Sequence, residues 1–297
     1  MSAAISDATK RPYGIERVCR VWEVPRSTVY SKRARAAAPP KPGKRRGPVP
    51  RVSDPELLTL IRADLERSHF VGEGHRKVWA RLRVRDGVLV SRKRVLRIMR
   101  ENHLLSPHRA RRASGAAHEG RIITDAPNVM WGTDGTQVLT VEEGNVWIFA
   151  AVEHWNAECV GWHVAKTGDR FAALQPVAMG LRTIYGPLEA EMARGLSLRM
   201  DHGTQYVSDH FRNQVRFWGI EASYAFVAEP QTNGVAERFM KTLKEQVVHG
   251  RSFQNVEELR AAMATFVELY NNEWLVEKVG FVSPRRAREL HDLRRAA

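Results

Sequence analysis

The stretch VMWGTDGTQVLTVEEGNVWIFAAVEH, residues 129–154, decides the fold. It contains two apolar runs, Val129 to Thr140 and Val146 to His154, separated by the turn sequence Glu143-Gly144-Asn145. We therefore predict two antiparallel strands joined by a short turn. Cys159 to Ala165 has the composition of a third strand, so the three form an antiparallel meander.

After the meander the pattern changes to alternating helices and strands. Helical spacing of apolar residues predicts a helix over Arg170 to Tyr185, and alternating apolar residues predict a strand from Leu196 to Asp201. The remaining elements are a helix capped by Ser208, a strand over Ile220 to Val227, and helices over about 233–249 and 255–272. An antiparallel meander followed by alternating units predicts an α/β fold, a mixed sheet with helices on its faces.

Length and composition limit the class of protein. At 297 residues the chain is long enough for two or three domains. A hydrophobic fraction of 43% and a charged fraction of 27% exclude a wholly disordered chain, a collagen and a coiled-coil rod. No stretch is apolar for the roughly 20 residues of a membrane helix, and we see no signal peptide. Two cysteines fit a reducing cytoplasm.

Charge is divided unevenly along the chain. Residues 1–120 carry 28 basic and 11 acidic side chains, whereas residues 121–297 carry 19 basic and 22 acidic ones. The front part is therefore net +17 and the back part net −3. This asymmetry indicates a polyanion-binding module joined to a second module, although a merely soluble basic protein is the plain alternative.

Two small all-α units are expected in the basic part. Residues 1–35 predict a helix-turn-helix, whose second helix offers Arg26, Ser27, Thr28 and Tyr30 to base edges and phosphates. A proline-rich basic linker, 36–53, follows. Residues 54–112 predict a second helix-turn-helix-like domain, in which Ser91 caps a helix that carries Arg92, Lys93 and Arg94. A basic helical hairpin without function remains the alternative for the first unit.

Three acidic residues lie where the predicted fold can bring them together. Asp134 lies within the first strand, Asp201 ends the strand that follows the meander, and Glu237 lies on the helix expected over 233–249. Carboxylate oxygens are hard ligands that suit Mg²⁺ or Mn²⁺. Two such ions can activate an attacking oxygen and stabilise a leaving one in phosphodiester chemistry.

Spacing alone does not select this triad. Asp201 and Glu237 are separated by 35 residues, but Asp209 and Glu245 have the same separation. Local pattern favours the first pair, because Asp209 follows the cap Ser208 and so belongs to the first turn of a helix.

Helix phase places two lysines on the face of Glu237. At about 100° per residue, Lys241 and Lys244 fall close to Glu237 and away from the stripe of Val235, Phe239 and Leu243. This face suits a metal held beside a phosphate backbone. The alternative is an ordinary ion pair within the helix, between Glu237 and Lys241.

These contexts, their order, the 35-residue gap and the lysine seven residues after the glutamate resemble the catalytic core of DDE transposases and retroviral integrases. Within this group the chain is most similar to the second-frame product of bacterial insertion sequences that encode their transposase in two overlapping frames. Further matches are Gly74-His75-Arg76-Lys77-Val78, Ser91-Arg92-Lys93-Arg94-Val95, Tyr270-Asn271-Asn272 and Ser283-Pro284. The sequence departs from the pattern at Glu273-Trp274-Leu275, where Arg-Pro-His is frequent, and at Glu153, where aspartate is common.

The resemblance implies a ribonuclease-H-like core over 125–250, a C-terminal helical tail over 251–297, and Asp134, Asp201 and Glu237 as ligands of two metal ions. It implies cleavage by water at the end of a mobile element, then attack of the freed 3′-hydroxyl on another DNA strand. The implied partners are DNA, further copies of the chain on that DNA, and the upstream-frame product; the implied location is the bacterial nucleoid. Two other readings stay open: a DNA-binding regulator with an inactive core, and a ribonuclease-H-type nuclease without strand transfer.

Overall fold

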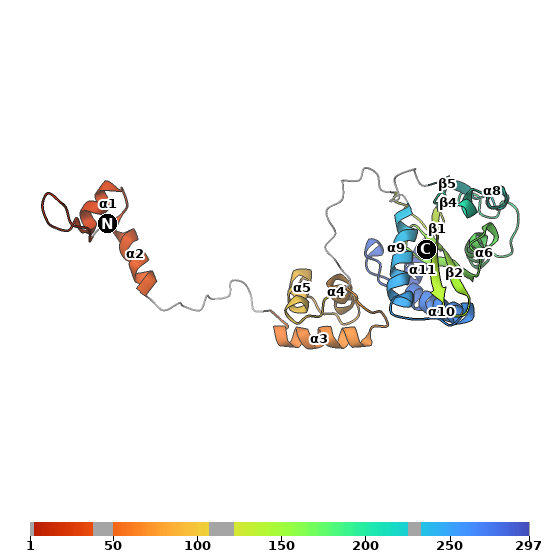
Figure 1. Ribbon diagram of the computed structural model, residues 1–297, viewed down its shortest axis with the longest axis horizontal. Coiled ribbons are helices and arrows are strands. Elements are labelled where there is room, and N and C mark those ends of the chain that lie inside the picture. The colour runs from red at the N-terminus through yellow and green to blue at the C-terminus, as the bar shows by residue number, and fades with distance from the viewer. Residues whose placement is uncertain (1–2, 38–49, 107–121, 225–232, 297) are drawn as a thin grey trace. The chain divides into compact units, whose positions relative to one another are not determined.

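The computed structural model describes residues 3–37, 50–106, 122–224 and 233–296 (Figure 1). The chain divides into two compact units, residues 1–51 and 52–297. Across the described residues, every helix is too short or too polar to cross a membrane.

The first unit is a pair of helices, as its sequence predicts. Helix α1 spans Gly14–Val21 and helix α2 spans Arg26–Ala37. Helix α2 begins directly after Pro25, whose fixed φ suits the first turn of a helix. Its polar and basic side chains are exposed, including Arg26, Ser27, Thr28 and Tyr30.

The second unit begins with three helices around a small apolar core. They are α3 (Asp54–Arg67), α4 (His75–Val84) and α5 (Arg92–Glu101). The Oγ atom of Ser91 accepts a hydrogen bond from the backbone of Arg94 and so caps α5, as predicted. The buried side chains at the centre are Leu57, Ile61, Val78, Leu82, Val95, Ile98 and Met99.

A buried ion cluster crosses this three-helix domain. The guanidinium of Arg81 donates to both carboxylate oxygens of Asp64, at 2.8–3.1 Å, and to the carboxylate of Glu73. All three side chains are buried. Charged groups are stable in such a place only when they are paired and hydrogen-bonded, so each of the three depends on the others.

The core domain is built on a five-stranded mixed sheet. Its strands are β1 (Met130–Thr140), β2 (Gly144–Glu153), β3 (Cys159–Ala165), β4 (Ser197–Met200) and β5 (Glu221–Tyr224), in the order β3-β2-β1-β4-β5. The first three are antiparallel, and β4 and β5 run parallel to β1. Gly144 supplies the turn between β1 and β2 with a φ of 68°. The predicted strand at Ile220 to Val227 is described only as far as Tyr224.

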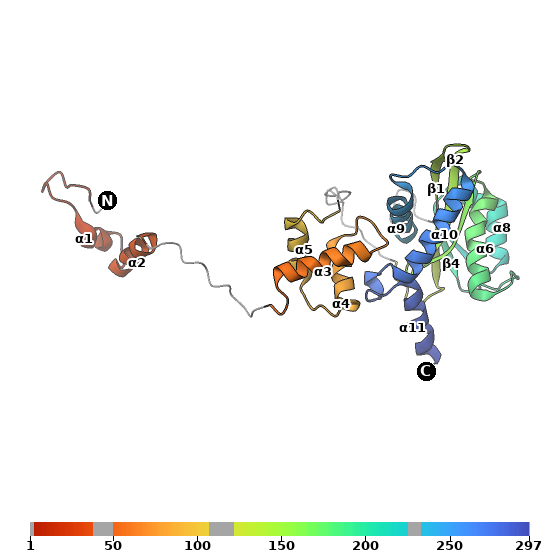
Figure 2. The same ribbon diagram turned by 90° about the horizontal axis from the view of Figure 1, so that it is seen from below.

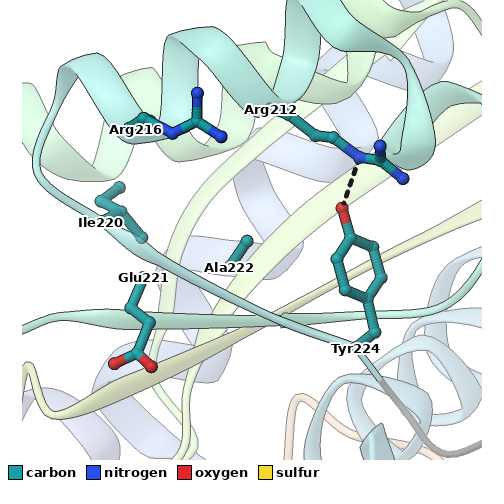
Figure 3. A pocket seen from close by; sticks show the side chains of 6 residues that line it. All are labelled: Arg212, Arg216, Ile220, Glu221, Ala222 and Tyr224. Carbon is teal, nitrogen blue, oxygen red and sulfur yellow. Dashed lines mark hydrogen bonds between the residues drawn. The ribbon is translucent and has the colours of Figure 1, made fainter.

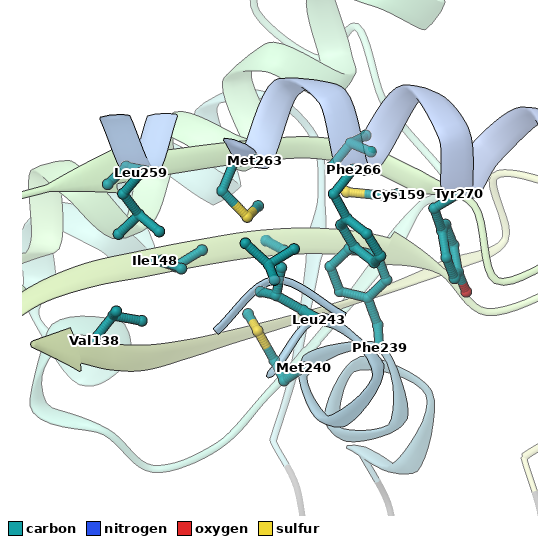
Figure 4. Close-up of a cluster of buried hydrophobic side chains, with 14 of the residues drawn as sticks. Val138, Ile148, Cys159, Phe239, Met240, Leu243, Leu259, Met263, Phe266 and Tyr270 are labelled. Atoms are coloured by element: carbon teal, nitrogen blue, oxygen red, sulfur yellow. The ribbon is translucent and has the colours of Figure 1, made fainter. Parts of the chain in front are cut away.

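Helices cover both faces of the sheet (Figures 1 and 2). On one face, α6 (Arg170–Tyr185) and α8 (Asp209–Phe217) share a buried apolar cluster with Trp131 and Phe149. On the other, α9 (Gly234–Leu243) and α10 (Val256–Glu273) pack over a cluster drawn in Figure 4. The sheet order and the helices on its two faces give the predicted ribonuclease-H-like architecture. Helix α10 contributes fully to this core, so residues after 250 are not a separate tail.

Four short or terminal elements complete the domain. A single-turn helix, α7 (Thr204–Val207), follows Asp201, and a π-helical turn, η2 (Lys244–Val248), follows α9; the sequence predicted neither. A 3₁₀ turn, η3 (Glu277–Val279), and α11 (Pro284–Ala296) end the described chain. Single π turns are frequent at functional sites, which draws attention to the end of α9.

The segment 273–281 fastens the three-helix domain to the core domain within the second unit. Its carboxylates accept from α4, α5 and the loop before α4: Glu273 pairs with His69, and Glu277 pairs with Arg76 and Arg92. Its aromatic rings contact the same domain, with Trp274 against Phe70 and Phe281 against Trp79. Lys77 lies over the ring of Trp274 and donates to the carbonyl of Leu275.

Candidate active site

Asp134 lies in the middle of β1, half-buried beside the other two acids. One carboxylate oxygen accepts a hydrogen bond of 2.8 Å from the backbone of Gly135. The pKa of Asp134 is raised to about 6, chiefly by burial and in addition by the charges of Asp201 and Glu237, against the lowering effects of the Gly135 hydrogen bond and of Lys244. Burial thus disfavours the charged form of this carboxylate, and the two neighbouring acids disfavour it further.

The register of the sheet brings Asp201 level with Asp134. Gly132 on β1 lies opposite Arg199 on β4, and the two strands are parallel. Asp134 comes two residues further along β1, and Asp201 comes two residues after Arg199, directly beyond the end of β4, so the two acids lie at the same level of the sheet. Asp201 is exposed and accepts a hydrogen bond of 2.8 Å from the backbone of Gly203.

Glu237 is held near β1 by the first turn of its helix. The side-chain amide of Asn233 donates to the carbonyl of Thr133, at 3.0 Å, one residue before Asp134. A side chain at Gly132 would meet the Oδ1 atom of Asn233 at 2.8 Å, so glycine permits this close approach of helix to strand. Desolvation raises the pKa of Glu237, and the charge of Asp201 raises it further.

Asp134 and Glu237 line one cavity of about 300 Å³ together with both predicted lysines. Met240, Lys241, Lys244, Glu245 and His249 form the rest of its wall. Lys241 lies 3.7 Å from Glu245, four residues along, rather than pairing with Glu237. Among the described residues Lys244 has no carboxylate within 4.0 Å, and its charge acts on Asp134 instead.

Asp209 and Glu245, the other pair with a 35-residue separation, lie in different parts of the core domain. Asp209 is the first residue of α8, next to its cap Ser208, as predicted. Glu245, in contrast, lines the cavity of Asp134 and Glu237. Local sequence pattern ranked the pair of Asp209 and Glu245 below that of Asp201 and Glu237, but it gave no sign of this position of Glu245, which lies in the π turn.

The donor set suits a hard divalent cation. All three acids offer carboxylate oxygens, and their charges raise the pKa of Asp134. In the described ranges, however, no three His, Cys, Asp or Glu side chains are close enough together to hold one ion. Asp134 and Glu237 share a cavity wall, and Asp201 lies on the neighbouring rim.

The other predicted DNA-contacting residues lie outside this site. Arg94 is half-buried and donates to Asp54 at 2.8 Å, and Arg92 donates to Glu277 at 3.2 Å. Lys93 between them is exposed. In the first unit, Arg26 lies 3.8 Å from Glu16, and Ser27, Thr28 and Tyr30 are exposed on α2.

Sequence analysis missed Asn233 as a positioning residue. Its buried amide connects the first turn of α9 to β1, as described above. The available signal was an Asn-Gly pair immediately before a helix that carries an acid in its first turn. That pair suggests a cap, but it does not reveal that the partner is the backbone of a strand 100 residues earlier.

Two protein families match parts of the chain. An HTH-like domain matches residues 54–112, and an integrase core domain matches residues 218–275, the segment that contains Glu237, Lys241 and Lys244. The catalytic core domain of BIV integrase is similar in structure at a TM-score of 0.42, with 17% identity, over 57% of this chain and 99% of that chain.

The relatives that match most of the chain are transposases of insertion sequences. The transposase for insertion sequence element IS629 of Shigella sonnei is 26% identical over 295 residues, which is 96% of this chain and 95% of that protein. Transposase InsD for insertion element IS2D of Escherichia coli is 31% identical over 230 residues, 73% of this chain and 75% of that protein. Because this relative is 31% identical over 73% of the chain, and an HTH-like domain and an integrase core domain match parts of the chain, the chain belongs to the family of insertion-sequence transposases.

Proposed function

We propose that the protein cuts a phosphodiester bond at the end of its mobile element and transfers the freed 3′-hydroxyl to another DNA strand. In the first step water attacks the phosphorus and the bond to the 3′ oxygen breaks, which leaves a 3′-hydroxyl. In the second, that hydroxyl attacks a phosphodiester of the second DNA and displaces its 3′ oxygen. The observation that supports the proposal is that Asp134 and Glu237 line one cavity with Lys241 and Lys244, while the charge of Asp201 acts on both of these acids.

We propose Asp134, Asp201 and Glu237 as the ligands of two Mg²⁺ or Mn²⁺ ions. Ions bound there supply polarisation of the attacking oxygen and stabilisation of the leaving one. The chain's own contribution is to fix the carboxylates: β1 and β4 set two of them in register, and Asn233 holds the helix that carries the third. A hard cation would stabilise the charged form of Asp134, which burial disfavours most and the charges of Asp201 and Glu237 disfavour further.

The partners follow from the same proposal. Lys241 and Lys244 face the element's end, while Arg26, Ser27, Thr28 and Tyr30 on α2 and Arg92, Lys93 and Arg94 on α5 form the DNA-binding surfaces of the two helical units. Because Arg92 and Arg94 already pair with Glu277 and Asp54, exposed Lys93 is the best placed of the three for a phosphate. We also propose that several copies assemble on DNA at the nucleoid, with the upstream-frame product as fusion or partner.

One assay separates the three readings. The full chain is mixed with Mg²⁺ and a labelled fragment that ends in the element's own inverted repeat, found by sequencing the flanking DNA. We expect the label in cut products and in products joined to a second DNA, and none of either when EDTA is present. Cut products alone would indicate a nuclease without strand transfer, and a shifted but intact fragment would indicate a regulator with an inactive core.

We expect Lys244→Ala to fold normally and to lose roughly 10- to 100-fold in activity on the element's own end. The reason is the loss of one charge-assisted contact to DNA, about 1.5–3 kcal/mol. Activity is measured on the labelled end fragment at physiological salt, and folding by thermal unfolding. Lys166→Ala is the matched control, since Lys166 is an exposed lysine paired with Glu143 away from the cavity. If Lys244→Ala joined the end fragment to a second DNA at the wild-type rate, Lys244 would have no role in the reaction.

A further inference from the structure

A second hollow lies along the edge of the sheet, between α8 and β5 (Figure 3). It has a volume of about 390 Å³, and its wall is formed by Arg212, Arg216, Ile220, Glu221, Ala222 and Tyr224. Strand β5 is the last in the sheet order, so the hollow lies at an edge with which no other strand of the described residues pairs. Neither arginine belongs to the cavity of Asp134 and Glu237.

The two arginines of this hollow have no acidic partner. Within the described residues, neither Arg212 nor Arg216 has a carboxylate within 4.0 Å, although other arginines of the core domain, such as Arg194, Arg260 and Arg285, are paired. The residues are four apart on α8, about 6 Å along the axis, and so share one face. The carboxylate of Glu221 points away from both guanidinium groups in Figure 3. Two cations side by side in a hollow form a site for an anion.

The guanidinium of Arg212 is held in one orientation. Its Nε atom donates to the hydroxyl of Tyr224, at 3.1 Å (Figure 3). That hydroxyl donates in turn to the carbonyl of Tyr206, at 3.4 Å. The bond uses Nε, so both terminal nitrogens of the guanidinium remain as donors for a ligand. A planar group fixed in this way binds a phosphate by two parallel hydrogen bonds at little entropic cost.

The hollow begins beside the acidic rim. Tyr224 on β5 lies opposite Met200 on β4, and Met200 is the residue before Asp201. The ring of Tyr224 stacks on the ring of His202, with centroids 5.4 Å apart and an angle of 18° between the planes. From this end the hollow continues along α8, from Arg212 to Arg216. An anionic strand bound there would pass directly from the acids onto the arginines.

We propose that the Arg212–Arg216 groove binds the sugar-phosphate backbone of the second DNA, the one that receives the 3′-hydroxyl. The proposal rests on the proposed function, because that reaction brings two DNAs to the same acids. Helix α9 with Lys241 and Lys244 covers one face of the sheet, and α8 with the two arginines covers the other. The acids lie at the rim between these two sets of cations, so each DNA has its own set.

Crosslinking tests the location of the second DNA. The two natural cysteines, Cys19 and Cys159, are buried. Because Arg216 is exposed, Arg216→Cys adds a thiol at the surface. We expect this full-length variant to form a disulfide with a thiol-tethered duplex of unrelated sequence and not with a thiol-tethered element end. Lys244→Cys should show the opposite preference. Arg182→Cys is the matched control and should capture neither, because Arg182 is exposed near the far end of α6.

A charge-reversed variant tests whether the groove contributes to the reaction. In Arg212→Glu with Arg216→Glu, the ratio of joined to cleaved product should fall about tenfold or more, through loss of two charge-assisted contacts. The salt dependence of binding to unrelated duplex should also weaken, with a slope lower by about 2, since each phosphate contact contributes about 0.9. Arg182→Glu should change neither quantity.

The outcomes distinguish failure of the groove from failure of the proposed function. If the wild-type chain neither cuts nor joins DNA, the proposed function is wrong, yet crosslinking and the salt slope still decide whether the groove binds DNA. Capture of the element end alone, or an unchanged salt slope and product ratio, would overturn the assignment. Disulfide-linked dimers of Arg216→Cys without capture of DNA would show instead that the edge of β5 is a contact between copies of the chain.

Discussion

We expect Asp134→Asn, Asp201→Asn and Glu237→Gln each to abolish cleavage and joining in Mg²⁺, while DNA binding stays nearly as in the wild type. Each change keeps the shape of the side chain and removes one anionic oxygen from the rim. Metal ions stabilise the charge of such a transition state by several kcal/mol. At a factor of ten for each 1.36 kcal/mol, a loss of roughly a thousandfold or more is expected. The measurement is the single-turnover rate on the labelled end, with binding followed by gel shift.

The control for this prediction is the second acidic pair. Asp209→Asn and Glu245→Gln should remain active, because Asp209 belongs to the exposed first turn of α8 and Glu245 pairs with Lys241. Glu245 is the stricter control, since it lines the same cavity as Glu237. An inactive Glu245→Gln beside an active Glu237→Gln would show that the third ligand has been misassigned.

Removing Arg81 from the buried ion cluster should strongly reduce the stability of the three-helix domain. Arg81→Met leaves the carboxylates of Asp64 and Glu73 buried without their common partner. Removing one member of a buried ion pair costs about 3–5 kcal/mol, which is a large part of the 5–15 kcal/mol that stabilises a typical domain. We expect the three-helix domain to unfold at a much lower urea concentration, followed by the fluorescence of Trp79. DNA binding through this domain should be lost with it.

A matched change and a rescue test the cause. Arg62→Met removes an exposed arginine from the neighbouring α3 and should alter the free energy of unfolding by less than about 0.5 kcal/mol. Replacing Arg81, Asp64 and Glu73 together by apolar residues of similar volume should recover most of the lost stability, since the desolvated charges leave as a set. If Arg81→Met unfolds like Arg62→Met, the ion cluster does not hold the domain together.

Most of the fold could be predicted because its signals are local. The meander and the helix after it follow from alternation, helical spacing and turn residues, and the observed bounds Cys159–Ala165 and Arg170–Tyr185 agree with the prediction. The short helix after Asp201 and the π turn at Lys244 were missed. Both are single turns, too short for periodicity, and they depend on what packs around them.

The site was predictable in its residues rather than in its geometry. Asp134, Asp201 and Glu237 could be chosen from their local contexts, but their approach depends on the register of β1 with β4 and on the hydrogen bond from Asn233. Neither is encoded by spacing. Arg94 was predicted to contact DNA because it lies on a basic helix. The structure shows that it is hydrogen-bonded to Asp54, 40 residues earlier, a partner that the local sequence does not reveal.

The segment 273–281 has a consequence for the timing of synthesis. It fastens the three-helix domain, yet it is translated more than a hundred residues after that domain ends at Glu101. At about 5–20 residues per second, roughly 10–30 s pass between the two. During this interval the nascent three-helix domain lacks the groups that later join it to the core domain. The proposed attachment of its helices to nearby DNA can therefore precede folding of the core domain.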